Sequence, residues 1–204
     1  MKLKGILLLN GQPYGGEIDC KNAYVVCCDG AYKWACAKVK IDENVGDFDS
    51  LDIIPAPPPS EIYPSEKNFT DGEIALFKLL EKGVDEVEIY GGYGGRYDHF
   101  IGNLHLLYAA HARGVAAKMI DENTVAFLGS GNIDLSGNRG KTFSLLPFGG
   151  AVHIMNSTGC KYDYPDKIGY GECRGISNIA ESGTASVTVD ENDCALIIVN
   201  RGEV

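Results

Sequence analysis

Short apolar runs alternate with helical patterns over about the first 120 residues of the chain. Four runs, at residues 5–9, 23–28, 86–90 and 116–120, have the length and composition of buried β-strands, and a weaker one lies near 61–63. Strands separated by helical segments are typical of a parallel sheet. The pattern therefore predicts an α/β domain with a mostly parallel sheet flanked by helices.

Two segments between these runs have the periodicity of amphipathic helices. Residues 71–82 place five apolar side chains on one stripe, and residues 97–112 repeat that spacing before an Arg-Gly stop. Thr70 is the predicted N-cap of the first helix, with Glu73 completing a capping box. The proline-rich segment 55–60 is compatible with neither a helix nor a central strand, so we expect a surface connection there.

The pattern changes beyond about residue 125. Helical periodicity disappears, and short alternating runs such as "KTFSLLPF" and "CALIIV" follow, separated by Gly, Asn and Asp turns. This arrangement is typical of a small antiparallel sandwich. We therefore predict an α/β domain over residues 1–124 and an all-β sandwich domain over residues 125–204.

Acidic residues follow several of the predicted strands. Asp29 comes directly after the run 23–28, and Asp47 and Asp49 stand two apart in "VGDFDS". The carboxyl ends of parallel strands share one edge of a sheet, where ligands bind, so these groups should meet there. An extended backbone would point Asp47 and Asp49 the same way. Two carboxylates ~4 Å apart repel by about 4 kcal/mol at an effective dielectric of 20, so a cation should lie between them.

The type of ligand favours magnesium. Carboxylate oxygens without nearby histidine or cysteine suit this hard ion, which fills its octahedron with water and substrate phosphates. The competing interpretation is local: Asp-x-Asp-Ser and Asp29-Gly30 are also ordinary turn or capping sequences. Asp71, in the first turn of the predicted helix 71–82, either complements the helix dipole or joins the acidic cluster.

A glycine-rich loop, "GGYGGRYDHF", follows the run 86–90. Its glycines let the backbone approach an anion and adopt positive φ, ahead of a helix N-terminus; they are Gly91, Gly92, Gly94 and Gly95. Arg96 adds a planar donor fork suited to phosphate oxygens. Asp98 either caps the helix or orients Arg96. A flexible connection would also explain the glycines, because their spacing matches neither the Walker nor the dinucleotide motif.

Charge and cysteine usage narrow the classes of function. The 204 residues carry a formal charge of −10, which argues against a nucleic-acid or anionic-membrane binder. No apolar segment approaches the ~20 residues of a membrane span. The seven cysteines are scattered without a CxxC pair, as expected for reduced thiols in the cytoplasm.

Several motifs, in this order and at these intervals, resemble the thiamine pyrophosphokinase (thiamine diphosphokinase) family. They are "CDGA", "GDFDS", "KNFTDGEIAL", "GGYGGRYDHFIGNLHLL" and, at 174–178, "RGISN". The resemblance implies a nucleotide-binding catalytic domain, a C-terminal β-sandwich for thiamine binding and dimerisation, and a homodimer. It also implies magnesium-dependent transfer of a pyrophosphoryl group from ATP to thiamine, giving thiamine diphosphate and AMP.

The resemblance also implies roles for individual residues. Metal ligands would be Asp29, Asp47, Asp49 and Asp71. The nucleotide would contact Asp29, Gly30, the four loop glycines and Arg96. Catalysis would involve Asp47, Asp49, Asp71, Arg96 and Asp98, with Asp71 and Asp98 both candidates for the base that accepts the hydroxyl proton. Thiamine would contact Asp98, Ser177 and Asn178.

The chain departs from the family pattern at two positions. Asn68 stands where the family usually has an aspartate, and Ile179 follows Asn178 where an acid is usual. The second change leaves open a magnesium-dependent phosphoryl or pyrophosphoryl transferase for a related alcohol. The first leaves open a non-catalytic sensor of nucleotides or thiamine phosphates.

Overall fold

The computed structural model describes residues 2–49, 51, 53, 55–59, 62–63 and 68–202. The chain divides into two compact units, residues 1–122 and 123–204. The division falls two residues before the boundary expected after residue 124.

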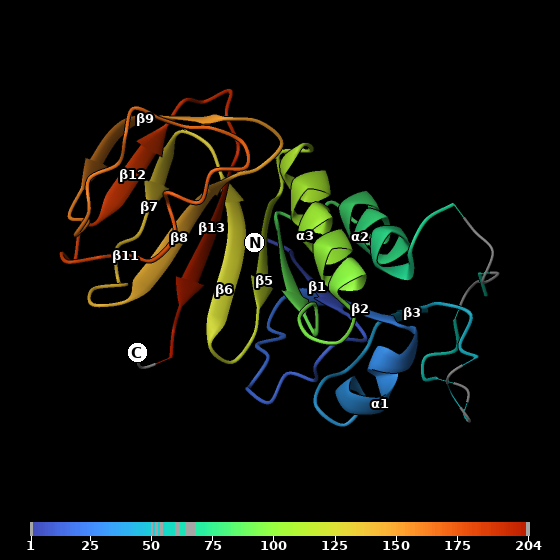
Figure 1. The fold of residues 1–204 in the computed structure, drawn as a ribbon. Helices are drawn as coiled ribbons and strands as arrows, with labels where there is room; N and C mark the ends of the chain where they lie inside the picture. Colours follow the sequence, from blue (N-terminus) through green and yellow to red (C-terminus); the bar gives the residue numbers. More distant parts are fainter. Residues whose placement is uncertain are drawn as a thin grey trace. The chain divides into compact units, whose positions relative to one another are not determined.

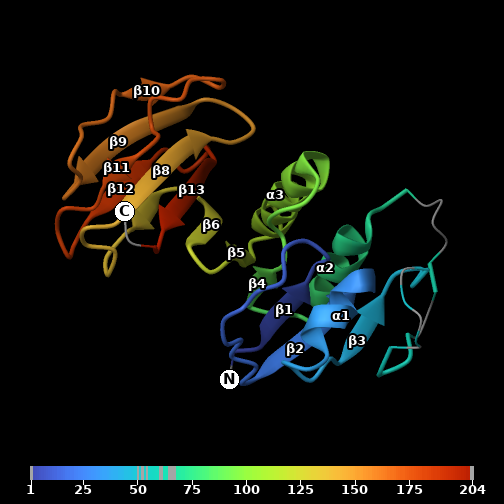
Figure 2. The ribbon, with the colours of Figure 1, turned by 60° about the horizontal axis from the view of Figure 1, so that its bottom comes forward.

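The described part of the first unit contains a five-stranded sheet in which every neighbouring pair is parallel. The strand order is β5-β4-β1-β2-β3. The strands are β1 (Lys4–Leu8), β2 (Ala23–Cys28), β3 (Glu43–Val45), β4 (Glu86–Tyr90) and β5 (Ala116–Ile120). The central strand β1 buries four of its five residues, as expected for a parallel strand covered on both faces. Figure 2 shows four of these strands side by side, in the order β4, β1, β2 and β3.

The strong apolar runs correspond closely to these strands, whereas the weak one does not. The runs 23–28, 86–90 and 116–120 coincide with β2, β4 and β5. The prediction of a strand near 61–63 is wrong at Ile62 and Tyr63, because neither residue lies in a strand. Glu61 falls outside the described residues. The strand beside β2 is instead β3, which has only three residues and owes its position to parallel pairing with β2.

Both long predicted helices are confirmed, as α2 (Asp71–Glu81) and α3 (Tyr97–His111). The Thr70 capping box is present: the Glu73 N–H donates to Thr70 Oγ1 at 3.2 Å, and the Thr70 N–H donates to Glu73 Oε2 at 2.8 Å. Helix α2 packs on β1 and β2, α3 packs on β5, and the two helices contact each other (Figure 1). A 3₁₀ turn, η1 (Asp29–Ala31), leads into the short helix α1 (Tyr32–Ala35).

The strand order creates a topological switch point in the first unit. From β1 the sheet continues through β2 and β3 on one side and through β4 and β5 on the other. Connections diverge at such a point, which opens a crevice beyond the carboxyl ends of the two central strands. The ends of β1 and β4 are therefore where this sheet is best suited to bind a ligand.

The second unit, as far as it is described, consists of strands and turns in two antiparallel sheets of order β11-β8-β13-β6 and β10-β9-β12-β7. The strands are β6 (Thr124–Gly129), β7 (Asn132–Asp134), β8 (Thr142–Pro147), β9 (Val152–Thr158), β10 (Lys167–Ile168), β11 (Asn178–Ile179), β12 (Ser186–Val189) and β13 (Ala195–Asn200). Both sheets contribute to one buried core, which includes Phe143, Leu145, Val187 and Ile197. The predicted all-β character of this region is confirmed.

Among the described residues, the helices lack the length and apolar character that a membrane span requires. All seven cysteines have free thiols.

Candidate active site

Three carboxylates converge at the carboxyl edge of the first unit's sheet. Asp29 follows β2, while Asp47 and Asp49 follow the neighbouring strand β3, and one oxygen from each lies within 4.8 Å of the others. Asp29 and Asp47 are half-buried and Asp49 is exposed. Three negative charges at this separation repel strongly unless a cation lies among them. The donor set, three hard carboxylate oxygens, fits a divalent ion such as Mg²⁺.

The backbone brings these acids together in a different way from the one expected. Phe48, between the two aspartates, has φ of 58°, so the expected extended backbone is absent. The Asp49 N–H donates to Asp47 Oδ1 at 3.3 Å, which closes a tight turn. Gly46 has φ of 148°, and a Cβ there would lie 2.9 Å from the Cβ of Asp29. The two loops can approach each other only because residue 46 has no side chain.

Asp71 lies near this cluster but is not among the three acids whose oxygens converge. It is the first residue of α2, where a negative charge complements the helix dipole. The Cys28 thiol donates to the Asp71 carbonyl oxygen at 3.5 Å, which places the start of α2 beside the end of β2. The structure thus brings Asp71 to the same edge of the sheet as Asp29.

The glycine loop after β4 runs alongside the residues that follow β1. Backbone hydrogen bonds continue past both strands: Leu9 N–H donates to Tyr90 O at 2.8 Å, and Gly11 N–H donates to Gly91 O at 2.8 Å. From α3, Asn103 Nδ2 donates to Gly92 O at 2.8 Å. The loop is therefore held in place at the switch point.

The loop glycines adopt the conformations that the sequence predicts at three of four positions. Gly91, Gly94 and Gly95 have φ of 69°, 82° and 72°. A side chain at Gly91 would overlap the carbonyl oxygen of Leu9, so this position requires glycine for two reasons. Gly92 lies against the side chain of Met119, where a Cβ would come within 2.8 Å of the sulfur.

Arg96 and Asp98 form a bidentate ion pair at the start of α3. Arg96 Nε donates to Asp98 Oδ1 at 3.1 Å, and Nη2 donates to Oδ2 at 2.5 Å. These hydrogen bonds lower the pKa of Asp98 to about 2. Both side chains remain largely exposed, at 73% for Arg96 and 62% for Asp98. Both roles considered for Asp98 have support: it orients Arg96, and its Oδ1 also accepts a hydrogen bond from the His99 N–H at 2.9 Å in the first turn of α3.

In the second unit, the two predicted thiamine contacts differ sharply. Ser177 is exposed and has φ of 61°. Asn178 is 4% exposed, and its amide is used within the protein. Its Oδ1 accepts from the N–H groups of Tyr162 (3.1 Å) and Ile179 (2.8 Å), and its Nδ2 donates to Tyr162 O at 2.8 Å. Asn178 therefore fixes the backbone of the loop at Tyr162.

Burial also affects Tyr164, two residues further along the same loop. Desolvation raises the pKa of Tyr164 to about 12, and the nearby Asn178 amide opposes that rise. The phenol is therefore neutral at physiological pH. A neutral, largely buried tyrosine supports the loop by packing.

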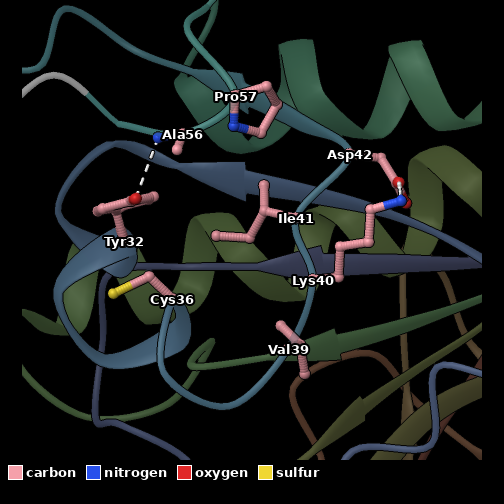
Figure 3. Close-up of a pocket in the computed structure, with 8 residues that line it drawn as sticks. All are labelled: Tyr32, Cys36, Val39, Lys40, Ile41, Asp42, Ala56 and Pro57. Carbon is pink, nitrogen blue, oxygen red and sulfur yellow. Dashed lines mark hydrogen bonds and ion pairs between the residues drawn. The ribbon is translucent and has the colours of Figure 1, made fainter.

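The first unit also has a hollow of about 530 Å³, between α1, the segment before β3 and residues 56–57 (Figure 3). The Tyr32 hydroxyl accepts a hydrogen bond from the Ala56 N–H at 3.0 Å across one side of it. Its lining is Tyr32, Cys36, Val39, Lys40, Ile41, Asp42, Ala56 and Pro57. Asp42, the acid among the described lining residues, accepts a hydrogen bond from the Val25 N–H at 2.9 Å. None of the predicted site residues lines this hollow.

One residue of the carboxyl edge, Asn10, was missed by sequence reasoning. It directly follows the apolar run of β1, and its side chain lies against Gly30. The Asn-Gly pair at 10–11 was a usable signal, because a polar dipeptide after a central strand lies at the carboxyl edge. What sequence could not supply was the strand order that makes β1 central.

Comparison with known proteins places both units in one family. The model of the "Thiamin pyrophosphokinase, catalytic domain" matches residues 18–119, and that of the "Thiamin pyrophosphokinase, vitamin B1 binding domain" matches residues 132–193. A thiamine pyrophosphokinase of Bacillus subtilis strain 168 is 37% identical over 128 residues. That alignment spans 59% of this chain and 60% of the relative's length.

Solved structures agree with the family models. A crystal structure of thiamine pyrophosphokinase from Bacillus subtilis superposes with a TM-score of 0.82 and 25% identity, covering 100% of both chains. A thiamin pyrophosphokinase family protein from Enterococcus faecalis shares the fold, with a TM-score of 0.81, 19% identity and 100% coverage of both chains. The catalytic-domain model spans half of the sequence and the vitamin B1-binding model follows it, so this chain belongs to the thiamine pyrophosphokinase family.

Proposed function

We propose that this protein is a thiamine diphosphokinase, which transfers a pyrophosphoryl group from ATP to thiamine. The observation that carries the proposal is the convergence of Asp29, Asp47 and Asp49 within 4.8 Å beside the switch point of a parallel sheet. In the reaction, the hydroxyl oxygen of thiamine bonds to the β-phosphorus of ATP. The bond from that phosphorus to the oxygen shared with the α-phosphate breaks, and AMP leaves with the electron pair.

The acidic cluster would hold Mg²⁺, with Asp71, which begins α2 at the same edge of the sheet, as the fourth predicted ligand. When bound, the ion neutralises phosphate charge and aligns the β-phosphate for in-line attack. The protein's own contribution is positional. The turn closed by Asp49 N–H and Asp47 Oδ1, together with Gly46, fixes the carboxylates before any ligand arrives.

The other predicted residues at this edge have complementary tasks. Arg96 is exposed and would exchange its Asp98 partner for phosphate oxygens of ATP. The hydroxyl proton of thiamine needs an acceptor, for which Asp71 and Asp98 are the predicted candidates. We assign the proton to Asp71, because it begins α2 at the same edge of the sheet as Asp29.

The second unit would supply the vitamin pocket, in keeping with the vitamin B1-binding model that it matches. We propose that Ser177 contacts thiamine directly, because it is exposed, and that Asn178 acts through the loop it anchors. We also propose a cytoplasmic homodimer. Large exposed apolar side chains, including Tyr97 at 85% and Ile101 at 56% on α3, are of the kind that oligomers cover. Light scattering at several protein concentrations tests this assembly.

The decisive experiment is detection of thiamine diphosphate by mass spectrometry after incubation with thiamine, ATP and magnesium. We expect thiamine diphosphate and AMP in equal amounts, and neither product when EDTA replaces magnesium. AMP release with another alcohol but not with thiamine would favour the related transferase that Ile179 leaves open. Ligand binding without any turnover would favour the sensor.

A further inference from the structure

Asn10 lies at the switch point of the sheet, and the proposed mechanism gives it no role. It follows β1, whose neighbours are β4 and β2. The acidic cluster begins after β2, and the glycine loop begins after β4. Asn10 therefore lies between the groups that would hold the cation and the loop that would hold the phosphates.

The backbone around Asn10 is fixed from both sides. The Leu9 N–H donates to Tyr90 O at 2.8 Å, and the Gly11 N–H donates to Gly91 O at 2.8 Å. From α1, Trp34 Nε1 donates to Leu9 O at 3.2 Å. The position of the Asn10 backbone is therefore set before a ligand arrives, which reduces the entropic cost of binding.

The amide of Asn10 occupies the space that a side chain at residue 30 would fill. A Cβ at Gly30 would come within 2.7 Å of Asn10 Cγ and 2.8 Å of Oδ1, and its three nearest atoms all belong to the Asn10 amide. The φ angle of Gly30 is not positive, so its backbone does not itself require glycine. Because residue 30, which follows Asp29, has no side chain, the Asn10 amide can lie against it.

No hydrogen bond to the Asn10 side chain is present among the described residues. Asn10 is exposed, so water can satisfy its amide in the free protein. A neutral NH₂ group beside an acidic cluster can donate to a phosphate oxygen without competing with the carboxylates for the cation. The geometry thus provides an exposed amide donor, on a fixed backbone and against Gly30, at the edge where a polyphosphate would lie.

We propose that Asn10 is a further substrate-binding residue of the nucleotide site, whose amide donates a hydrogen bond to an oxygen of the ATP triphosphate. This inference rests on the proposed function. It adds to the acids and the glycine loop a neutral donor supplied by the central strand. Gly30, which has no side chain, leaves the space that the Asn10 amide occupies.

Titration calorimetry with magnesium and either ATP or inorganic tripolyphosphate tests this role. We expect Asn10→Ala to weaken both ligands by about 10-fold, the loss of one hydrogen bond to a charged group. Asn10→Asp, which keeps the shape and adds a negative charge, should weaken them more. The matched control is Asn156→Ala, an exposed asparagine of β9, which should leave both affinities unchanged.

A double-mutant cycle separates contact from shape. Gly30→Ala should weaken ATP binding in the wild-type background by displacing the amide, and should add little in the Asn10→Ala background, where the methyl group has space. An equal loss in both backgrounds, or an Asn10→Ala protein that binds tripolyphosphate like the wild type, would overturn the inference and leave the proposed function standing. A wild-type protein that binds both ligands through Asn10 but makes no thiamine diphosphate would refute the proposed function alone.

Discussion

The carboxyl edge of the first unit and the loop around Asn178 in the second unit contain polar residues of similar type, used in opposite ways. At the edge, Asp29, Asp47 and Asp49 bring like charges within 4.8 Å of one another. In the second unit, the amide of Asn178 is buried and makes three hydrogen bonds to the backbone. The first arrangement is unfavourable without a ligand, and the second is complete without one.

This difference shows which residues should respond to a ligand and which should respond to unfolding. A group held in a repulsive arrangement stabilises a bound cation more than it stabilises the fold. A buried amide that is bonded to the backbone does the reverse, because its loss leaves backbone groups unsatisfied. Substitutions in the two regions should therefore separate activity from stability.

Asp49→Asn should have the largest effect, and it should act on activity. Removing one charge from the cluster is expected to lower kcat/KM by on the order of 10²–10³-fold, comparable to loss of one electrostatic contact in a transition state. In EDTA the melting temperature should rise slightly, because repulsion with Asp29 and Asp47 is relieved. Steady-state kinetics and thermal melts with and without magnesium measure both effects.

Glu86→Gln is the control for that substitution. Glu86 is an exposed acid at the start of β4, at the opposite end of the strand from the site, and the change removes one charge in the same way. It should leave kcat/KM unchanged. If Asp49→Asn also retained full activity, the metal assignment of the cluster would be wrong.

Asn178→Ala should come second, and it should act on stability. It leaves both backbone groups of Tyr162 and the N–H of Ile179 without their partner, for a loss of about 2 kcal/mol in the free energy of unfolding. Chemical denaturation followed by circular dichroism measures this, with the exposed Asn156→Ala as control. Unchanged stability together with a raised KM for thiamine would instead make Asn178 a direct ligand contact.

How far sequence reasoning reached depended on whether a feature is local. The capping box of Thr70 and the strand bounds of β2 and β4 follow from neighbouring residues, and both were predicted. Strand β3 was missed because three residues carry no apolar run of their own, and only pairing with β2 makes them a strand. The role of Asn10 depends on strand order, which no local pattern contains.

The acids and the amide show the same limit at the level of side chains. Sequence reasoning brought Asp47 and Asp49 to the right edge, but through an extended backbone that Phe48, at φ of 58°, does not adopt. It also selected Asn178 as a ligand contact without any means of knowing that Tyr162, sixteen residues earlier, uses its amide. Residue type and position can be predicted from sequence, whereas the partner of a hydrogen bond requires the fold.

Ser177→Gly should have a smaller effect than Asn178→Ala and in the opposite direction. Ser177 has φ of 61°, which costs a non-glycine residue about 1–2 kcal/mol, and the flexibility of glycine in the unfolded chain offsets part of this gain. We expect the free energy of unfolding to rise by ~0.5–1 kcal/mol.

Ser177→Ala keeps the backbone cost and removes only the hydroxyl. A contact of that hydroxyl with thiamine would raise the KM for thiamine equally in both variants, and an unchanged KM would argue against the contact.

The Arg96–Asp98 pair lies between these two extremes, because it is formed within the protein yet remains exposed to solvent. The hydrogen bonds from Arg96 lower the pKa of Asp98 from an ordinary 3.8 to about 2. A depressed carboxyl pKa stabilises the folded state at pH values above the ordinary one, and this contribution is lost as the pH falls from about 4 towards 2. Arg96→Ala should therefore return the pKa of Asp98 towards 3.8, as measured by carboxyl-carbon NMR titration. The pKa of Asp190, which is lowered by Asn192, should not change and serves as the internal control.

If Arg96 transfers to the phosphates of ATP, saturating nucleotide should raise the pKa of Asp98 in the wild type as well. A pKa that stays near 2 with ATP bound would mean that the pair is structural, like Asn178, and that Arg96 does not hold the nucleotide.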